Sequence, residues 1–267
     1  MTELLYAYAV TRVEPRTAAP GGQPPYGPGI DGAAVGTVAE GELAALVSRV
    51  PSAEFDEAAL QDRLEDLGWL ERVARAHHAV VAAASGAGCA LPLRLATVYR
   101  DEDGVRRMLR QDHDRLRAAL ERLDGRVEWG VKVYATPAAA PAPPAPAVAP
   151  GGGGGAVSGR AYLRQRLRER HSQDTALQQG TDLAERLDAD LSRHAEERRL
   201  HRPQDPRLSR RDGVNVLNAS YLVPAGDAHA FAERARALGA EDERVRVELT
   251  GPWAPYSFAG TGAAEAS

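Results

Sequence analysis

The sequence has a single cysteine, a single lysine and few aromatic side chains. Cys89 stands alone, which excludes an intramolecular disulfide and any cysteine-rich metal cage. Nothing near it in sequence indicates a base or an anion-binding site, so we interpret it as a small buried side chain. Lys132 is the only lysine, and we attribute the arginine-rich composition to base bias of the genome. These features favour a reducing, cytoplasmic environment.

The sequence also lacks long apolar runs and a strong charge of one sign. No basic region followed by an apolar stretch begins the chain, so neither a signal peptide nor a membrane span is predicted. The net charge is -4, and arginines alternate with acids. Nucleic-acid binding requires a concentrated basic surface. We therefore expect neither a nucleic-acid partner nor a membrane.

Sequence motifs of common catalytic sites are absent as well. There is no Gly-x-Ser-x-Gly, and the run Gly151–Gly155 has no preceding strand and no following Lys-Ser/Thr, as a phosphate-binding loop would. His77 and His78 have no metal-ligand partners at suitable spacing, and His77 falls on an apolar helix face, which indicates a core histidine. We expect no catalytic residue, no metal and no cofactor.

One segment divides the chain. Residues 136–158 alternate alanine with proline and then run into five glycines, a composition that cannot bury enough apolar area to fold. It predicts a linker between an N-terminal α+β domain, 1–135, and a C-terminal α+β domain, 159–258, with a tail at 259–267. A second Pro/Gly-rich loop, 15–32, is expected to be either disordered or an exposed excursion between strands.

Hydrophobic periodicity predicts the elements of each half. The first half is expected to contain strands 4–11, 33–38, 91–99 and 127–134, an ambiguous apolar segment 43–50, and helices 56–84 and 103–123. The second half is expected to contain charged helix over 159–202, divided near Gly180, then strand 214–223, helix 227–238 and strand 244–250. The fold class is α+β with two domains, each a small sheet covered by helices, the first ferredoxin-like.

Two side-chain hypotheses concern the strands and the C-terminus. Arg94 and Glu128 are placed away from the apolar faces of their strands, so we predict a cross-strand ion pair if those strands are neighbours. Trp253, Tyr256 and Phe258 form an aromatic cluster after the last strand, where two prolines oppose regular structure. The cluster either wraps back over its own domain or offers a partner site.

Several motifs occur in the order seen in one known family. They are Leu5-Tyr6-Ala7-Tyr8, the stretch 91–99 (LPLRLATVY), the strand 128–133 (EWGVKV), the strand 218–223 (NASYLV), and the ending 251–258 (GPWAPYSF). Through them the sequence resembles the gas vesicle GvpL/GvpF family across both halves. Where the family commonly has proline, this chain has Ala254, and the linker is a larger departure. The resemblance marks as candidate motif or interaction residues Pro92, Arg94, Glu128, Trp129, Tyr221, Gly251, Pro252, Trp253, Pro255, Tyr256 and Phe258.

The resemblance implies a non-enzymatic accessory protein in gas vesicle assembly, and hence in buoyancy. Its implied partners are the gas vesicle shell protein and other gas vesicle accessory proteins, during nucleation and growth, in the cytoplasm and at the gas vesicle. It leaves open whether the chain belongs to the GvpF or the GvpL branch. Two other functions remain open from the residues: a small-ligand binder or enzyme on ferredoxin-like domains, which needs a concave polar cavity, and an arginine-rich nucleic-acid adaptor, against which the alternating acids argue.

Overall fold

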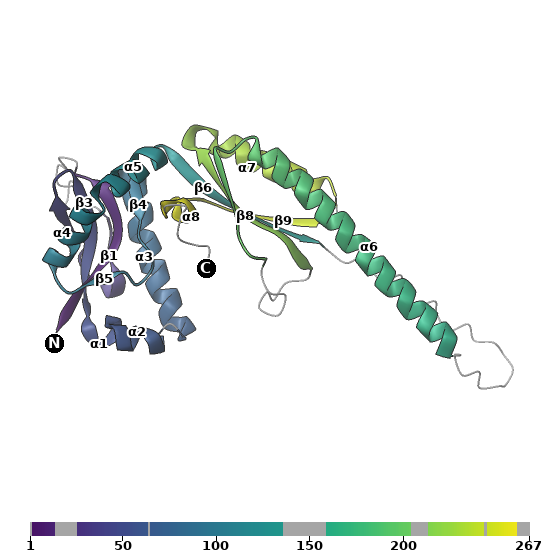
Figure 1. The fold of residues 1–267 in the computed structure, drawn as a ribbon, viewed down its shortest axis with the longest axis horizontal. Coiled ribbons are helices and arrows are strands. Elements are labelled where there is room, and N and C mark those ends of the chain that lie inside the picture. Colours follow the sequence, from purple (N-terminus) through teal and green to yellow (C-terminus); the bar gives the residue numbers. More distant parts are fainter. Residues whose placement is uncertain are drawn as a thin grey trace. The chain divides into compact units, whose positions relative to one another are not determined.

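The chain contains two compact units, whose described residues are 2–13, 26–63, 65–135, 159–203, 213–242 and 245–260 of a computed structural model (Figure 1). Contacts group residues 1–128 and 252–267 into the first unit and residues 129–251 into the second. The predicted linker, 136–158, lies outside the described residues, as does the predicted tail beyond residue 260. The predicted division at 135 and 159 stays a prediction, but the contact grouping differs from it at the strand β6 (Arg126–Ala135) and at the C-terminus.

The first unit is built on an antiparallel sheet in the order β2-β3-β1-β4. Its strands are β1 (Glu3–Arg12), β2 (Gly36–Glu40), β3 (Leu43–Pro51) and β4 (Ala90–Pro92), with the short β5 (Val98–Tyr99) pairing with β1. β1 is central and apolar on both faces, and Tyr6 to Val10 are fully buried. A strand covered on both faces reads as a continuous apolar run, which is why strand 4–11 was predicted closely.

The helices of the first unit are shorter and more numerous than predicted. They are α1 (Ser52–Phe55), α2 (Glu57–Arg63), α3 (Leu67–Ala87), α4 (Glu102–Gln111), α5 (His113–Leu123) and the short α8 (Tyr256–Ala259). The expected helix 56–84 is divided because the Asp66 side chain caps a new helix by accepting bonds from the amides of Gly68 and Trp69. The expected helix 103–123 is divided at Asp112, whose backbone leaves the helical region.

The predicted strand 91–99 was wrong in its middle. β4 ends at Pro92, and the chain makes a turn before β5, in which Ala96 has a positive φ of 61° and the amide of Thr97 donates to the carbonyl of Arg94. Alternating side chains do not distinguish this turn from a strand. The loop prediction for 15–32 is wrong for part of the described stretch 26–32: Tyr26 and Ile30 are buried in the core, Ile30 in the 3-10 helix η1 (Ile30–Gly32), whereas Asp31 and Gly32 are exposed.

The second unit has the element order strand-helix-strand-strand-helix-strand, the split βαβ arrangement of ferredoxin-like folds. Its elements are β6 (Arg126–Ala135), α6 (Gly159–Ser192), β7 (Glu197–Leu200), β8 (Val214–Pro224), a 3-10 turn η2 (Ala225–Asp227), α7 (Ala228–Ala240) and β9 (Val245–Trp253). The sheet order is β7-β8-β6-β9. The α+β class with two antiparallel sheets is confirmed, while β6, expected in the first domain, belongs to the second sheet.

The long helix α6 lies over β8 and α7 with its C-terminal half (Figure 1). The predicted division at Gly180 was wrong, because that glycine is required for close packing. A Cβ at position 180 would lie 2.6 Å from the Cβ of Ala135 in β6. Glycine inside a helix costs about 0.5–1 kcal/mol relative to alanine, but the absence of a side chain here lets the helix approach the sheet. At the other end of the unit, β9 continues through Pro252, which an edge strand tolerates.

Candidate interaction site

The C-terminal motif packs onto the first unit. Phe258 is fully buried, and Ala254 and Pro255 are buried beside it. Helix α8, which carries Tyr256 and Phe258, contacts β4 and α5. The motif was expected either to cover the domain of the preceding strand or to be exposed. The motif therefore covers the first unit and not the domain of the preceding strand, so the first expectation was wrong. Only part of the motif is exposed, which limits the second expectation to that part.

A buried carboxylate holds this segment by two hydrogen bonds. The Ser257 amide donates to Glu128 Oε2 at 2.7 Å, and the Ser257 hydroxyl donates to Glu128 Oε1 at 2.5 Å. Glu128 is only 6% exposed, so its placement on the outer face of the strand was wrong. On the other side, Arg122 of α5 donates to the Phe258 carbonyl at 2.6 Å. Bonds to a charged acceptor in such a site are among the stronger ones in proteins.

The aromatic rings of the motif meet two histidines of α3. The Tyr256 ring centroid lies 6.1 Å from that of His77 and 6.2 Å from that of His78. Trp253 meets His78 edge-on at 4.8 Å. Trp253 is 40% exposed and Pro252 is also exposed, whereas the rest of the motif is covered wholly or in part. The surface available to a partner is therefore the Pro252-Trp253 end.

His77 lies beneath this segment in a buried polar cluster, as its position on the apolar face predicted. It is 3% exposed, and its Nδ1 lies 2.9 Å from the Tyr6 hydroxyl, which also accepts the amide of Ala96. Burial lowers the pKa of His77 to about 4 and raises the pKa of Tyr6 and of Tyr256. All three groups are therefore neutral at pH 7, and the cluster has the character of a structural core.

The other candidate residues fall into different places. Pro92 is buried in β4, opposite Ala9 of β1, and Arg94 is exposed in the turn that follows. The ion pair between Arg94 and Glu128 stays a prediction. Gly251, the first residue of the motif, has a φ of 130°, a value that favours glycine.

Two further candidates lie in the second unit, to which Gly251 also belongs. Trp129 is 6% exposed in β6, and Tyr221 is fully buried in β8, where its hydroxyl donates to Asp188 Oδ1 at 2.6 Å. Their positions are those of core residues. Thus only Glu128 and the C-terminal residues 252–258 come together in one place.

Sequence reasoning missed three residues that hold the motif. Ser257 was part of the quoted motif but was not singled out, although a hydroxyl between two aromatic positions is a signal that could have been used. His78 was considered only as a metal ligand. Arg122 carried no signal, since its role depends on how α5 meets the returning chain.

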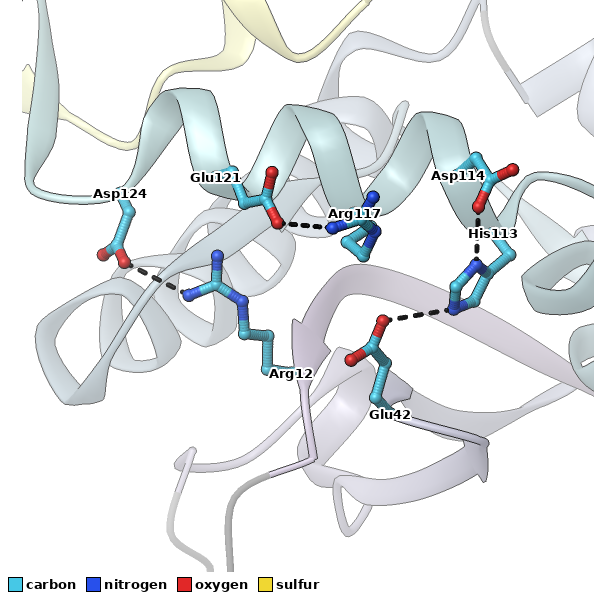
Figure 2. Close-up of polar contacts among 7 residues, drawn as sticks. All are labelled: Arg12, Glu42, His113, Asp114, Arg117, Glu121 and Asp124. Atoms are coloured by element: carbon cyan, nitrogen blue, oxygen red, sulfur yellow. Dashed lines mark hydrogen bonds and ion pairs between the residues drawn. The ribbon is translucent and has the colours of Figure 1, made fainter.

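The carboxylates of α5, and Asp124 just after it, lie beside basic side chains, as expected of a charged helix face. Figure 2 shows Arg117 paired with Glu121 along the helix at 2.8 Å, and Asp124 paired with Arg12 of β1 at 3.2 Å. It also shows His113 between Asp114 and Glu42, at 3.0 and 3.3 Å. This arrangement is that of a solvated charged surface.

Cys89 has the properties of an unreactive thiol. Its Sγ donates to the Leu120 carbonyl at 3.3 Å, and burial raises its pKa to about 11. It lines a cavity of about 120 Å³, whose charged members Arg12 and Asp124 pair with each other. Within the described ranges, no cluster of three or more metal-ligating side chains occurs.

None of the helices in the described part of the chain combines the length and the apolar composition of a membrane span.

Comparison with known proteins gives consistent matches. The family described as "Gas vesicle synthesis protein GvpL/GvpF" matches residues 4–260. Gas vesicle protein L of Streptomyces sp. (strain CB03234) is 52% identical over 96% of this chain and 93% of its own. Gas vesicle protein F of the same strain is 28% identical over 82% of this chain and 85% of its own.

Solved structures match the fold over its full extent. The crystal structure of GvpF from Anabaena sp. PCC7120 superimposes with a TM-score of 0.69 at 18% identity, covering 97% of both chains. That of GvpF from Microcystis aeruginosa gives a TM-score of 0.64 at 18% identity, covering 97% of this chain and 99% of the other. At such identity these likenesses concern the fold alone. With the sequence matches, they agree with the motifs noted above, and the chain belongs to the gas vesicle GvpL/GvpF family.

Proposed function

We propose that this protein is a non-enzymatic accessory protein that binds the gas vesicle shell protein or other gas vesicle accessory proteins during vesicle nucleation and growth. The observation that carries the proposal is the family match over residues 4–260, together with 52% identity to a gas vesicle protein L. Family membership supports a role in gas vesicle assembly. The choice of partner and of assembly stage is our proposal.

Keeping apolar shell subunits from pairing too early is a task that suits an accessory protein without an active site. Subunits of an apolar shell carry apolar surface and strand edges that pair unproductively until they are incorporated. An accessory protein reduces this by offering them a temporary binding surface. Such a surface requires exposed apolar side chains on a stable support, and no reactive centre.

Trp253 meets that requirement. Its ring is 40% exposed and is supported from the side by His78, while Phe258 and Ala254 anchor the same segment in the core. Tryptophan is enriched among residues that dominate binding energy. We therefore assign the Pro252-Trp253 end of the motif to partner contact and the remainder of the motif to folding.

The two relatives from one Streptomyces strain also bear on the branch. This chain shares 52% identity with that strain's gas vesicle protein L and 28% with its gas vesicle protein F. Since both proteins occur together in one organism, the difference favours the L branch.

The alternative of a small-ligand binder or an enzyme has little support among the described residues. Typical ligand pockets are about 300–1,000 Å³ and mostly apolar. The cavity beside Cys89 measures about 120 Å³. A second hollow of about 310 Å³ is open and lined chiefly by charged residues such as Arg49, Arg100 and Asp101. In the first cavity burial raises the pKa of Cys89 to about 11, and its neighbour Asp124 is paired with Arg12.

The test is binding of purified shell protein, or of other gas vesicle accessory proteins, to the full chain and to Trp253→Ser. Deleting residues 251–258 is unsuitable because it would remove Phe258 from the core. We expect Trp253→Ser to weaken binding about tenfold or more, as loss of an interface tryptophan does. The matched control is Val13→Ser, which changes a 46% exposed side chain of the same unit. Equal binding by all three proteins would refute the role of Trp253, and no binding by the wild type would refute the proposed function.

A further inference from the structure

Strand β9 forms one edge of the second sheet. It is the last strand in the order β7-β8-β6-β9, and among the described residues it pairs with β6 on one side and with no strand on the other. We define the β9 edge as residues 245–251, the part of this strand that belongs to the second unit. An edge strand presents backbone amides and carbonyls that can pair with another strand.

The strand β9 is the longest of the edge strands in the described parts of both sheets. It has nine residues, whereas β4 has three, β7 has four and β2 has five. Proteins commonly block such an edge with proline or a bulge. The first proline of β9 is Pro252, which follows the β9 edge, and Val247 and Leu249 are half-exposed along it. The edge therefore offers both backbone groups and apolar side chains to another strand.

The side chains of the β9 edge alternate between the two faces of the sheet. Val247 faces helix α7, where a Cβ at Gly239 would lie 2.7 Å from it. Arg246 and Glu248 lie on the opposite face, with Arg246 placed 4.8 Å from the centre of the Tyr134 ring and 3.6 Å from the Glu248 carboxylate. This face of the edge thus carries one positive and one negative side chain, separated by one residue.

The order of these charges selects one register for pairing of the β9 edge with itself. In an antiparallel pair, opposing residues lie on the same face, and a two-fold axis passes through one residue position. With the axis at Val247, Arg246 of each copy is opposite Glu248 of the other, and Val245 is opposite Leu249. Moving the axis by one residue places Arg246 opposite Arg246, or Glu248 opposite Glu248. Like charges directly opposite each other are destabilising.

The other edges do not have this property. In β7, an axis at Glu197, Arg198 or Arg199 places each of these residues opposite its own copy, so like charges meet in every case. The edge strand β2 has one charged residue, Glu40, which pairs with Arg110 of α4 at 3.0 Å, so charge selects no register there. The short strand β4 is contacted by α5 and α8.

We propose that two copies of this protein associate through the β9 edge, antiparallel and with Val247 at the two-fold axis, so that their four-stranded second sheets become one continuous sheet. Each Arg246 then lies beside Glu248 of its own strand and opposite Glu248 of the other copy. The contact is isologous and therefore closes at two copies. It does not include Pro252 or Trp253, so it is independent of the proposed binding to shell or accessory proteins.

The first test is the molecular mass of the full chain in solution. Sedimentation equilibrium over a range of protein concentrations should show a monomer that converts to a dimer and grows no further. A monomer at all concentrations would overturn the proposal. A mass that continues to rise beyond two copies would also overturn it, because a two-fold contact leaves no free surface of the same kind.

The second test reverses the charges. Arg246→Glu and Glu248→Arg should each weaken dimerisation about tenfold or more, because like charges then face each other twice across the axis. A mixture of the two variants should form a heterodimer, since every opposing pair again joins an acid to an arginine. The double variant should dimerise by itself for the same reason. Single variants that dimerise like the wild type, or a mixture and a double variant that stay monomeric although folded by circular dichroism, would contradict the proposal.

Matched controls separate this contact from general effects of net charge. Arg236→Glu on α7 and Glu185→Arg on α6 make the same changes of charge at exposed positions of the second unit, away from the β9 edge. Both should leave dimerisation unchanged. If they weaken it as much as the variants of Arg246 and Glu248 do, the proposal is wrong.

Cysteine cross-linking tests the register. Cys89 is the only cysteine, so Cys89→Ala removes the background. In that chain, Val247→Cys should give a disulfide-linked dimer on mild oxidation, because opposing Cα atoms of antiparallel strands are about 4.5–5.5 Å apart, within reach of a disulfide. The control Thr250→Cys lies three residues from the axis, about 20 Å from its counterpart, and should not cross-link. Cross-linking of Thr250→Cys in preference to Val247→Cys would overturn the proposed pairing.

Discussion

The hydrogen bonds between Glu128 and Ser257 give the sharpest prediction of how the C-terminal motif is held. Ser257→Ala removes the hydroxyl that donates to Glu128 Oε1 and leaves the amide bond to Oε2. A hydrogen bond to a charged group contributes about 1.5–3 kcal/mol, and the buried carboxylate would keep an unpaired oxygen. We therefore expect the docked segment to be destabilised by about 2 kcal/mol, which corresponds to roughly thirty times more frequent opening.

Hydrogen–deuterium exchange of the amides in residues 252–260 measures this opening directly. The exchange rate of this segment should rise about thirtyfold in Ser257→Ala. Glu128→Gln should have an effect of similar direction, and the double variant should be less destabilised than the sum of both, because the same bond is lost once. The control is Glu121→Gln, whose pairing with Arg117 on the exposed side of α5 contributes less than about 1 kcal/mol. Unchanged exchange in Ser257→Ala, or strict additivity with Glu128→Gln, would refute the reasoning.

Three further predictions concern stability. Because the pKa of His77 falls from 6.5 unfolded to about 4 in the fold, the unfolded chain binds an additional proton between these values. The contribution of neutral His77 to the free energy of unfolding should thus be fully present above pH 6.5 and fall by about 3 kcal/mol as the pH drops to 4. Urea titrations at several pH values would contradict this if His77→Leu kept the wild-type dependence of the free energy of unfolding on pH. Gly180→Ala should destabilise the fold by about 1–3 kcal/mol through overlap with Ala135. Gly86→Ala, in open space on α3, should stabilise it by about 1 kcal/mol. Thermal unfolding in which Gly180→Ala is the more stable of the two variants would count against the packing of α6. Ala96→Gly should stabilise by about 1 kcal/mol by relieving its positive φ, and a lower melting temperature would show that the turn is not strained.

The sequence predicted those elements whose signal is local. β1 was found within a few residues because it is buried on both faces and reads as an apolar run, and β8 because its first half alternates and its second half, 219–223, is buried. The ambiguous segment 43–50 is the strand β3, which is apolar for the same reason but has no alternation to distinguish it from helix. The single helix expected over 56–84 was too long because a capping carboxylate at Asp66 was not weighed against an unbroken apolar pattern.

The remaining errors needed information from distant parts of the chain. Nothing local shows that β6 pairs in the second sheet, or that Gly180 faces Ala135 instead of ending a helix. The same holds for the aromatic motif, whose identity was clear from sequence but whose place depends on Glu128 and α5. The motif could therefore be identified from the sequence, but which of its residues are buried and which are exposed follows only from the tertiary structure.

The proposed function is a role in building the gas vesicle. The direct measurement is removal of this chain from the cell that makes it, with gas vesicles counted by electron microscopy and shell protein quantified by immunoblot. We predict that vesicles are lost or strongly reduced while shell protein is still produced, and that the wild-type chain restores them. Vesicles of normal number and shape in the absence of the chain would contradict the account.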